Sequence, residues 1–228
     1  MKQYYYSDNR VTIYNACASE ASALPRYRFA FADPPFDLNL DPFENSLRSV
    51  SDNLFLMSSE RNLISFCAKN IEAFTRMYAV DTVVPKLISN SAPMQLADFI
   101  AHLRFSKKSK VGFVNNNQAF SNLIRCAKVR QRKQYSGNFD KGETLPAYFI
   151  KHFTVEADTC VDLFAGSFST TFAAVKLSRK SIAFEIDEAM CERAARILSQ
   201  KNLFDFNEHP TGLPVYNNTQ SNHVKRLP

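Results

Sequence analysis

Residues 159–186, TCVDLFAGSFSTTFAAVKLSRKSIAFEI, indicate the fold class most clearly. An apolar run at residues 159–164 leads into a turn at Ala165-Gly166-Ser167, and a helical segment at 170–177 leads into a second apolar run at 181–186. Two strands joined by one helix form a compact βαβ unit, which brings parallel strands into one sheet. The stretch therefore predicts an α/β fold with a mostly parallel sheet.

Segments on either side continue the same alternation. We expect strands at residues 11–14, 27–32, 54–57, 74–84 and 99–105, and helices at 16–24, 59–73, 144–153 and 189–200. The tail at residues 207–228 contains few apolar side chains, so we expect a loose end there. A chain of 228 residues suits a single domain, here expected to span 1–228.

The turn inside the βαβ unit has the composition of a ligand-binding loop. Gly166 can adopt backbone angles closed to other residues, and it lets a ligand approach closely. The second strand ends in Glu185, with Asp187 beside it, and acids at this place suit the two hydroxyls of a ribose. An ordinary βα turn with solvated acids explains the same residues. This loop alone therefore leaves a nucleoside site and a plain turn about equally open.

A second candidate site is Asp33-Pro34-Pro35-Phe36, which follows the apolar run at residues 27–32. A strand does not easily continue through two prolines, so Asp33 is expected at a strand's carboxyl end, where open α/β sheets bind ligands. A carboxylate and the rigid carbonyl after it can accept two hydrogen bonds from one NH2 group. The aromatic ring can stack on the base that bears this group. A proline-stiffened strand exit with a capping aspartate is the structural alternative.

Together the two motifs are far more specific than either one alone. The chain resembles the DNA amino-methyltransferases that use S-adenosylmethionine, in which a D/N/S-P-P-Y/F motif holds the target amino group. A D-x-F-x-G-x-G motif, followed by a strand that ends in an acid, binds the cofactor in that family. The resemblance implies catalytic roles for Asp33, Pro34, Pro35 and Phe36, and cofactor contacts from Lys141, Asp162, Phe164, Ala165, Gly166, Ser167, Glu185 and Asp187.

The motif order, with the amine site first and the glycine-rich turn last, is that of the family's β group. The resemblance covers most of residues 10–203 and implies a Rossmann-like methyltransferase fold: a mostly parallel mixed sheet, helices on both faces and a permuted motif order. Phe168 replaces the family's second glycine, so we expect the ring to reshape the pocket or tilt the turn. The run Tyr14-Asn15-Ala16-Cys17 lacks the acid that contacts the cofactor's adenine in relatives.

The net charge of +6 comes from one segment of the chain. Residues 104–141 hold ten basic side chains and one acid, whereas the remaining residues sum to −3. We expect residues 107–140 to form a basic insertion, because it falls where the family inserts target recognition. Contacts to DNA phosphates are predicted for Lys107, Lys108, Lys110, Arg125, Lys128, Arg130, Arg132 and Lys133. A solvated charged surface is the alternative.

Composition excludes several other classes of protein. A hydrophobic content of 45% provides for a real core and excludes wholesale disorder. The five cysteines are scattered and contain no CxxC pair, so we expect reduced thiols and no metal site. The polar N-terminus lacks a signal peptide and no stretch approaches a membrane span, which favours a cytoplasmic, DNA-associated protein.

The sequence thus predicts a methyltransferase that moves the methyl group of S-adenosylmethionine to an exocyclic amine of a base flipped out of duplex DNA. Asp33 favours N6 of adenine, although N4 of cytosine presents the same chemistry. A catalytically weak or silent DNA-binding homologue is the rival, and an RNA or protein methyltransferase is a third reading. Because the recognition segment is short, a homodimer could extend the DNA surface.

Overall fold

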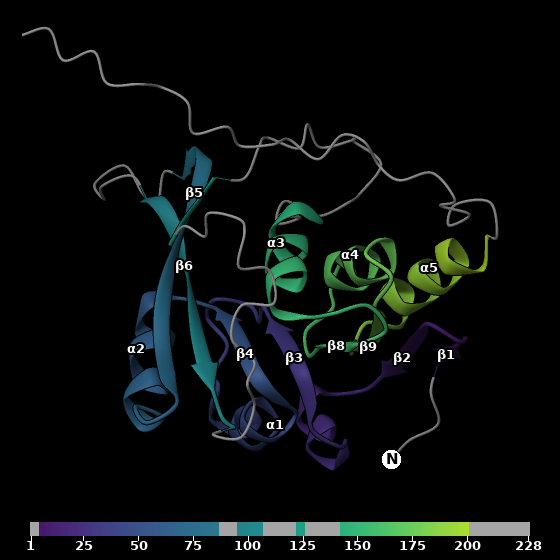
Figure 1. Ribbon diagram of the computed structural model, residues 1–228, viewed down its shortest axis with the longest axis horizontal. Coiled ribbons are helices and arrows are strands. Elements are labelled where there is room, and N and C mark those ends of the chain that lie inside the picture. The colour runs from purple at the N-terminus through teal and green to yellow at the C-terminus, as the bar shows by residue number, and fades with distance from the viewer. Residues whose placement is uncertain (1–4, 87–94, 107–121, 126–141, 201–228) are drawn as a thin grey trace, which may run out of the picture.

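The computed structural model describes residues 5–86, 95–106, 122–125 and 142–200, which form a sheet with helices packed against it (Figure 1). The strands are β1 (Tyr6–Ser7), β2 (Val11–Asn15), β3 (Tyr27–Ala32), β4 (Ser51–Met57), β5 (Phe74–Lys86), β6 (Gln95–Arg104), β7 (Leu123–Arg125), β8 (Thr159–Asp162) and β9 (Lys180–Glu185). The α-helices are α1 (Glu44–Ser49), α2 (Glu60–Lys69), α3 (Thr144–Phe153), α4 (Ser169–Lys176) and α5 (Glu188–Ser199), and two 3-10 helices are η1 (Ala18–Ala23) and η2 (Asp41–Phe43).

Within the described ranges the strands form one mixed sheet, in the order β1-β2-β9-β8-β3-β4-β6-β5-β7. The five neighbours from β2 to β4 are parallel, so their carboxyl ends lie along one edge, called the carboxyl edge below. Strand β6 runs antiparallel to both β4 and β5, and it ends at the opposite, amino edge. Strand β7 is parallel to β5.

Strands β5 and β6 project past the end of β4 on the side of the carboxyl edge. Met57, the last residue of β4, pairs with Ile100 of β6, which in turn pairs with Tyr78 of β5. The remainder of β5 therefore extends beyond the sheet's central strands, and β7 pairs with this projecting part through Ala79 and its neighbours. The topology thus builds a short wall beside the ends of β3 and β4 (Figure 1).

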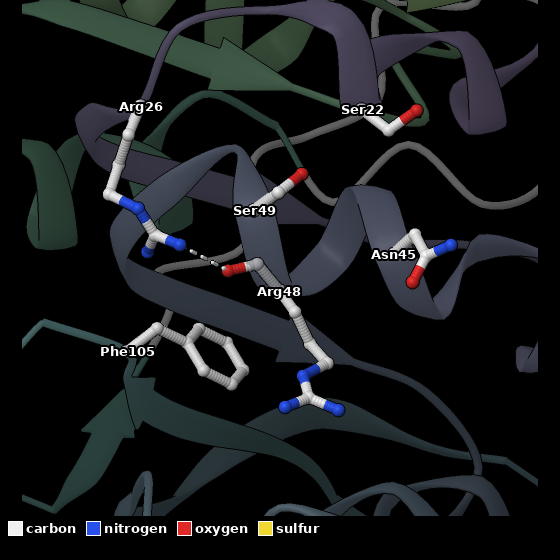
Figure 2. A pocket seen from close by; sticks show the side chains of 6 residues that line it. All are labelled: Ser22, Arg26, Asn45, Arg48, Ser49 and Phe105. Atoms are coloured by element: carbon white, nitrogen blue, oxygen red, sulfur yellow. Dashed lines mark hydrogen bonds between the residues drawn. The ribbon is translucent and has the colours of Figure 1, made fainter.

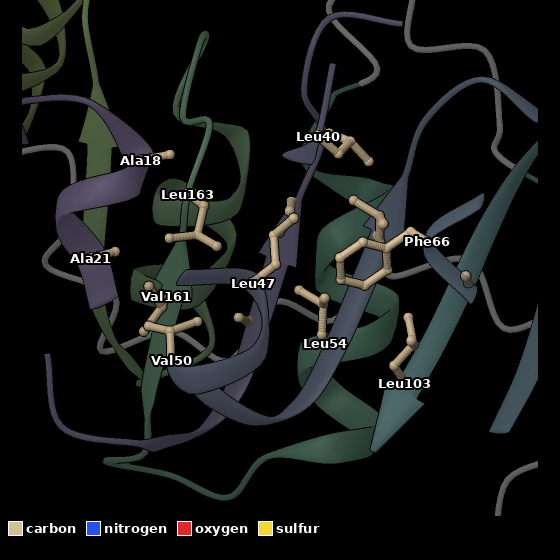
Figure 3. Close-up of a cluster of buried hydrophobic side chains, with 14 of the residues drawn as sticks. Ala18, Ala21, Leu40, Leu47, Val50, Leu54, Phe66, Leu103, Val161 and Leu163 are labelled. Atoms are coloured by element: carbon tan, nitrogen blue, oxygen red, sulfur yellow. The ribbon is translucent and has the colours of Figure 1, made fainter. Parts of the chain in front are cut away.

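Side-chain alternation along the central strands divides the core between the two faces of the sheet. Ala30 and Ala32 of β3 pack with η1, α1 and α2, whereas Phe29 and Phe31 pack with α3 and α4. Figure 3 shows the first of these clusters, which contains Ala18, Ala21, Leu47, Val50, Leu54, Phe66, Leu103 and Val161. Because β3 and β4 are covered on both faces, their sequences read as continuous apolar runs.

The elements predicted from the sequence are present, with changes at some of their ends. The predicted strand at 27–32 and helix at 144–153 coincide with β3 and α3. The helix predicted at 16–24 is instead the 3-10 helix η1, and the helix predicted at 59–73 ends at Lys69. Buried Ala18 and Ala21 are three residues apart, which is the repeat of a 3-10 helix.

Several predictions concern residues outside the described ranges. The tail at 207–228 and Lys141 lie there, and so do seven of the basic residues, Lys107, Lys108, Lys110, Lys128, Arg130, Arg132 and Lys133. Arg125 is the last residue of β7. Cys17, Cys67, Cys160 and Cys191 are free thiols. In the part of the chain that the structure describes, no helix has the length and apolar character needed to cross a membrane.

Candidate active site

The Asp33 motif, Asp33-Pro34-Pro35-Phe36, directly follows strand β3 and lies at the carboxyl edge. The strand ends at Ala32, after which Asp33 is partly exposed and Pro34 is buried. The Leu38 N–H donates to the Pro35 carbonyl oxygen at 3.0 Å and closes a turn. Within the described ranges, the Pro34 carbonyl accepts no backbone hydrogen bond. The carbonyl next to Asp33 therefore keeps its acceptor capacity for a ligand.

Asn62 of α2 holds the loop that follows this motif, and sequence reasoning missed it. Its Nδ2 donates to the carbonyl oxygens of Phe36 at 3.2 Å and Leu38 at 2.9 Å. The same atom lies 3.1 Å from Ser58 Oγ, which anchors the amide to the end of β4. The Phe36 ring packs against the aromatic cluster between the sheet and α3. These contacts fix the backbone that carries Asp33.

The glycine-rich turn lies beside this motif, because β8 is the neighbour of β3 and Asp162 pairs with Phe31. Gly166 has a φ of +49°, in the left-handed region that favours glycine. A Cβ atom at Gly166 would meet no other atom within 4 Å, so the space over the turn is open. The turn can therefore accept close approach of a ligand.

Phe168 has the left-handed conformation that explains why relatives carry glycine at this position. Its φ is +62°, and it immediately precedes α4. A phenylalanine in this region is strained by about 1–2 kcal/mol. Its ring is 1% exposed and packs with Val11, Ile13 and Cys191, between the sheet and α5. Burial of the ring offsets the strain and leaves the space over Gly166 open.

Glu185 connects the turn to the neighbouring strand β9. The Gly166 N–H donates to its Oε2 at 2.7 Å, and the Asp187 N–H donates to its Oε1 at 2.9 Å. A carboxylate oxygen can accept more than one hydrogen bond, so the partly exposed Glu185 retains capacity for hydroxyl donors. The backbone thus fixes the orientation of this carboxylate.

The two residues after Glu185 have features that the motif alone did not indicate. Asp187 accepts hydrogen bonds from the Ala189 and Met190 N–H groups, so its carboxylate caps α5. Ile186 was not singled out from the sequence, yet its side chain is 75% exposed at the carboxyl edge. An exposed apolar side chain beside an oriented carboxylate suits a ligand that has both a flat apolar part and hydroxyl groups.

Asp162 is buried beneath the turn. Burial raises the pKa of its carboxyl group to about 7, the Thr170 side chain and the Phe164 N–H lower it, and the charges of Asp33 and Glu185 raise it. The influence of Asp33 and Glu185 on Asp162 follows from their places at the ends of the adjacent strands β3, β9 and β8. The charges of Asp33 and Glu185 make this edge negative, which favours a cationic ligand.

This pKa gives the stability of the protein a defined pH dependence. The folded chain holds the Asp162 proton up to about pH 7, whereas the ordinary pKa of an aspartate is 3.8, so stability falls as pH rises between these values and then levels off. Asp162→Asn removes this titration. Between pH 5 and pH 8 the free energy of unfolding of the native chain should therefore fall by roughly 2–3 kcal/mol relative to that of Asp162→Asn. Urea unfolding at both pH values measures this. Parallel pH profiles for the two proteins would contradict the assignment.

A hollow of about 450 Å³ lies at the other end of the sheet, lined by Ser22, Arg26, Asn45, Arg48, Ser49 and Phe105 (Figure 2). Arg26 immediately precedes β3 and Phe105 follows β6, which places the hollow at the amino edge. The Arg26 guanidinium donates to the carbonyl oxygens of Ser51 at 2.8 Å and Arg48 at 3.1 Å. It thereby ties α1 to β4, which is a structural role remote from Asp33.

The described residues contain no group of three or more His, Cys, Asp or Glu side chains suited to a metal ion. The carboxyl edge instead brings together most of the residues predicted from the two motifs. Asp33, Pro34, Asp162, Gly166 and Glu185 lie at or just after the ends of β3, β8 and β9. Acceptor groups suited to an amine and a turn suited to a cationic, hydroxyl-bearing ligand are thus adjacent.

Residues 102–196 match the family model described as DNA methylase. The resemblance inferred from the sequence is confirmed. The matched range includes the glycine-rich turn and Glu185 of the methylase pattern, and Asp33 lies before it. A comparison with curated proteins found no match.

Solved structures share the fold at low sequence identity. A crystal structure of M1.HpyAVI with S-adenosylmethionine has a TM-score of 0.65 at 21% identity, covering 83% of this chain and 99% of that one. PvuII DNA methyltransferase, described as cytosine-N4-specific, has a TM-score of 0.69 at 17% identity, covering 87% and 90%. A putative DNA modification methylase from Thermus thermophilus has a TM-score of 0.60 at 14% identity, covering 84% and 95%. The chain has the Rossmann-like fold of these methyltransferases.

Proposed function

We propose that the protein transfers the methyl group of S-adenosylmethionine to an exocyclic amine of a DNA base, with N6 of adenine as the preferred acceptor. One observation carries the proposal. The Asp33 motif and the Gly166–Glu185 pair lie far apart in the sequence, yet they occupy the ends of adjacent strands at one edge. Chemistry that joins an amine to a cationic methyl donor needs these two sites side by side.

The cofactor side of the site suits S-adenosylmethionine. The Glu185 carboxylate is oriented to accept hydrogen bonds from the ribose hydroxyls, and Ile186 offers an apolar surface for the adenine. The open space over Gly166 admits the rest of the molecule. The negative charge of Asp33 and Glu185 favours its sulfonium and ammonium groups. We assign further contacts to Phe164, Ala165 and Ser167 on the same turn.

The acceptor side is the Asp33 motif. The Asp33 carboxylate and the Pro34 carbonyl would accept hydrogen bonds from the two amine hydrogens, and Phe36 would stack on the base after it leaves the duplex. Both acceptors favour a tetrahedral nitrogen, which attacks the methyl carbon as the carbon–sulfur bond breaks and sulfur takes the electron pair. The methylated amine then releases one proton to solvent water. Direct transfer of this kind depends mainly on positioning.

The acceptor base is assigned from the first residue of the motif. Family members with Ser at that position tend to be cytosine enzymes, whereas this chain has Asp33. N4 of cytosine is the alternative acceptor, and the neighbour PvuII DNA methyltransferase is described as specific for it. Analysis of the methylated nucleoside distinguishes the two.

The basic insertion divides into two parts with different attachments to the sheet. Lys107, Lys108 and Lys110 follow Ser106, where β6 has ended at the amino edge. Lys128, Arg130, Arg132 and Lys133 instead follow Arg125, at the end of β7 on the wall beside the carboxyl edge. We therefore assign the main DNA contacts to the second part, whose attachment lies next to the candidate active site.

Removal of three charges from each part tests this assignment with a matched control. Arg130→Ala, Arg132→Ala and Lys133→Ala combined should weaken binding to duplex DNA and lower the slope of log affinity against log salt by about 2–3. The combined Lys107→Ala, Lys108→Ala and Lys110→Ala variant removes the same charge and should change the slope much less. Fluorescence anisotropy at several salt concentrations measures both slopes. Equal slopes for the two variants would contradict the assignment.

A silent DNA-binding homologue is the second candidate, since Phe168 and the run at residues 14–17 depart from the family pattern. The structure favours the active enzyme, because the Phe168 ring is buried away from the open space over Gly166. The test is incubation of labelled S-adenosylmethionine with duplex DNA, RNA or a protein mixture. Label in DNA alone supports the proposal. Absence of both transfer and cofactor binding would support the silent homologue.

A further inference from the structure

Asn15 forms hydrogen bonds to the backbone just where β9 ends. It is the last residue of β2, and its Nδ2 donates to the carbonyl oxygens of Glu185 at 3.1 Å and Ile186 at 3.0 Å. The Ala16 N–H donates to the Glu185 carbonyl at 3.0 Å, and Cys191 Sγ lies 3.7 Å from the same oxygen. One amide thus ties β2 to two consecutive peptide units of the β9–α5 turn.

These two peptide units carry the side chains that face the proposed cofactor. Glu185 supplies the oriented carboxylate, and Ile186 supplies the exposed apolar surface. Within the described residues, no side chain other than Asn15 donates to the Ile186 carbonyl. Without this amide, the exposed end of β9 would rely on the bonds that the Glu185 carboxylate makes to Gly166 and Asp187.

We propose that Asn15 is a positioning residue for the cofactor, which holds Glu185 and Ile186 in the orientation that binds the adenosine part. The inference rests on the proposed function and adds a residue to it. It also gives a structural role to a position in the run where the resembled family carries an acid. In this chain the position favours a hydrogen-bond donor, because the two atoms nearest to Asn15 Nδ2 are carbonyl oxygens, and the third, Cys191 Sγ, is more distant at 3.8 Å.

Asn15→Asp should therefore weaken binding of S-adenosylmethionine more than Asn15→Ala does. An ionised carboxylate has no donor, and its oxygen would lie about 3 Å from two carbonyl oxygens that also accept only. Alanine removes the hydrogen bonds without adding this repulsion. Only a protonated aspartate can donate one hydrogen bond, so the Asn15→Asp variant should regain part of its affinity as the pH is lowered.

Calorimetric titration with S-adenosylmethionine tests the order of the variants. Asn15→Ala should bind about threefold to tenfold more weakly than the native chain, as expected for the loss of one or two hydrogen bonds, and Asn15→Asp should bind more weakly still. The difference in affinity between Asn15→Asp and the native chain should be smaller at pH 6 than at pH 8. Asn45→Asp makes the same chemical change on α1 at the amino edge and should bind like the native chain.

Circular dichroism and thermal unfolding of each variant separate positioning from folding. If Asn15→Asp binds as tightly as the native chain or more tightly, the inference is overturned. It is also overturned if both variants lose stability while their affinity stays unchanged, since Asn15 would then be purely structural. If the native chain itself does not bind S-adenosylmethionine, the proposed function fails, which is a distinct result.

Discussion

Asp33→Ala should reduce the rate of methyl transfer to DNA by roughly 10²- to 10⁴-fold, the usual effect of removing a group that acts on the reacting atoms. The loss should fall on the chemical step, because Asp33 is proposed to hold the acceptor amine and orient its lone pair. Affinity for S-adenosylmethionine should change by no more than about threefold, since the proposed ribose contacts belong to Glu185 on another strand. Single-turnover assays with excess enzyme measure the chemical step directly.

A matched control lies on the same loop. Asp37 is exposed four residues after Asp33, and Asp37→Ala removes the same charge without removing the proposed amine acceptor. This control should retain most of the native activity. Asp33→Asn keeps one oxygen acceptor, so its rate of methyl transfer should lie between those of the native chain and Asp33→Ala. Full activity of Asp33→Ala on a substrate that the native chain methylates would show that the proposed mechanism is wrong.

Glu185→Ala should weaken binding of S-adenosylmethionine by about 100-fold, as expected for the loss of one or two hydrogen bonds to a charged acceptor. The variant loses the proposed acceptors for the ribose hydroxyls and also the two bonds that order the turn, from the N–H groups of Gly166 and Asp187. Calorimetric titration gives the affinity. Saturating cofactor should restore much of the transfer rate, because the Asp33 site is intact.

Glu188→Ala is the appropriate control, because Glu188 is exposed in the first turn of α5, three residues after Glu185. It should bind the cofactor with nearly native affinity. Native affinity in Glu185→Ala would exclude the carboxylate from the cofactor site. A variant that is merely less stable would instead show a lower unfolding temperature and unchanged affinity at a temperature where it is folded.

The sequence predicted the central sheet well because its signals there are local. The buried run at residues 27–32 and the turn at Gly166 each specify their own element, and the prolines after Asp33 end β3. Both motifs then had to meet, because parallel strands in a βαβ arrangement place their carboxyl ends at one edge. The short elements β1, α1 and β7 carry no comparable pattern, and they were not predicted.

The residues that the sequence did not reveal act through contacts between distant segments. Asn62 bonds to the Asp33 loop and Asn15 bonds to the end of β9, and neither partner lies nearby in the sequence. Phe168 was recognised as a departure, but its left-handed backbone and buried ring follow from packing between the sheet and α5. Asp187 is predicted to contact the cofactor, and its carboxylate also caps α5, a role that its position before a helix predicts.

We propose above that this edge of the sheet methylates an exocyclic amine in DNA. The most direct test is to incubate the native chain with unmethylated duplex DNA and S-adenosylmethionine, digest the DNA to nucleosides and identify the products by mass spectrometry. We expect N6-methyladenine with the native chain and none when Asp33→Ala replaces it. N4-methylcytosine would correct the acceptor base while keeping the mechanism. DNA that stays unmethylated when the cofactor is bound, across duplexes of varied sequence, would show that the protein is not a DNA methyltransferase.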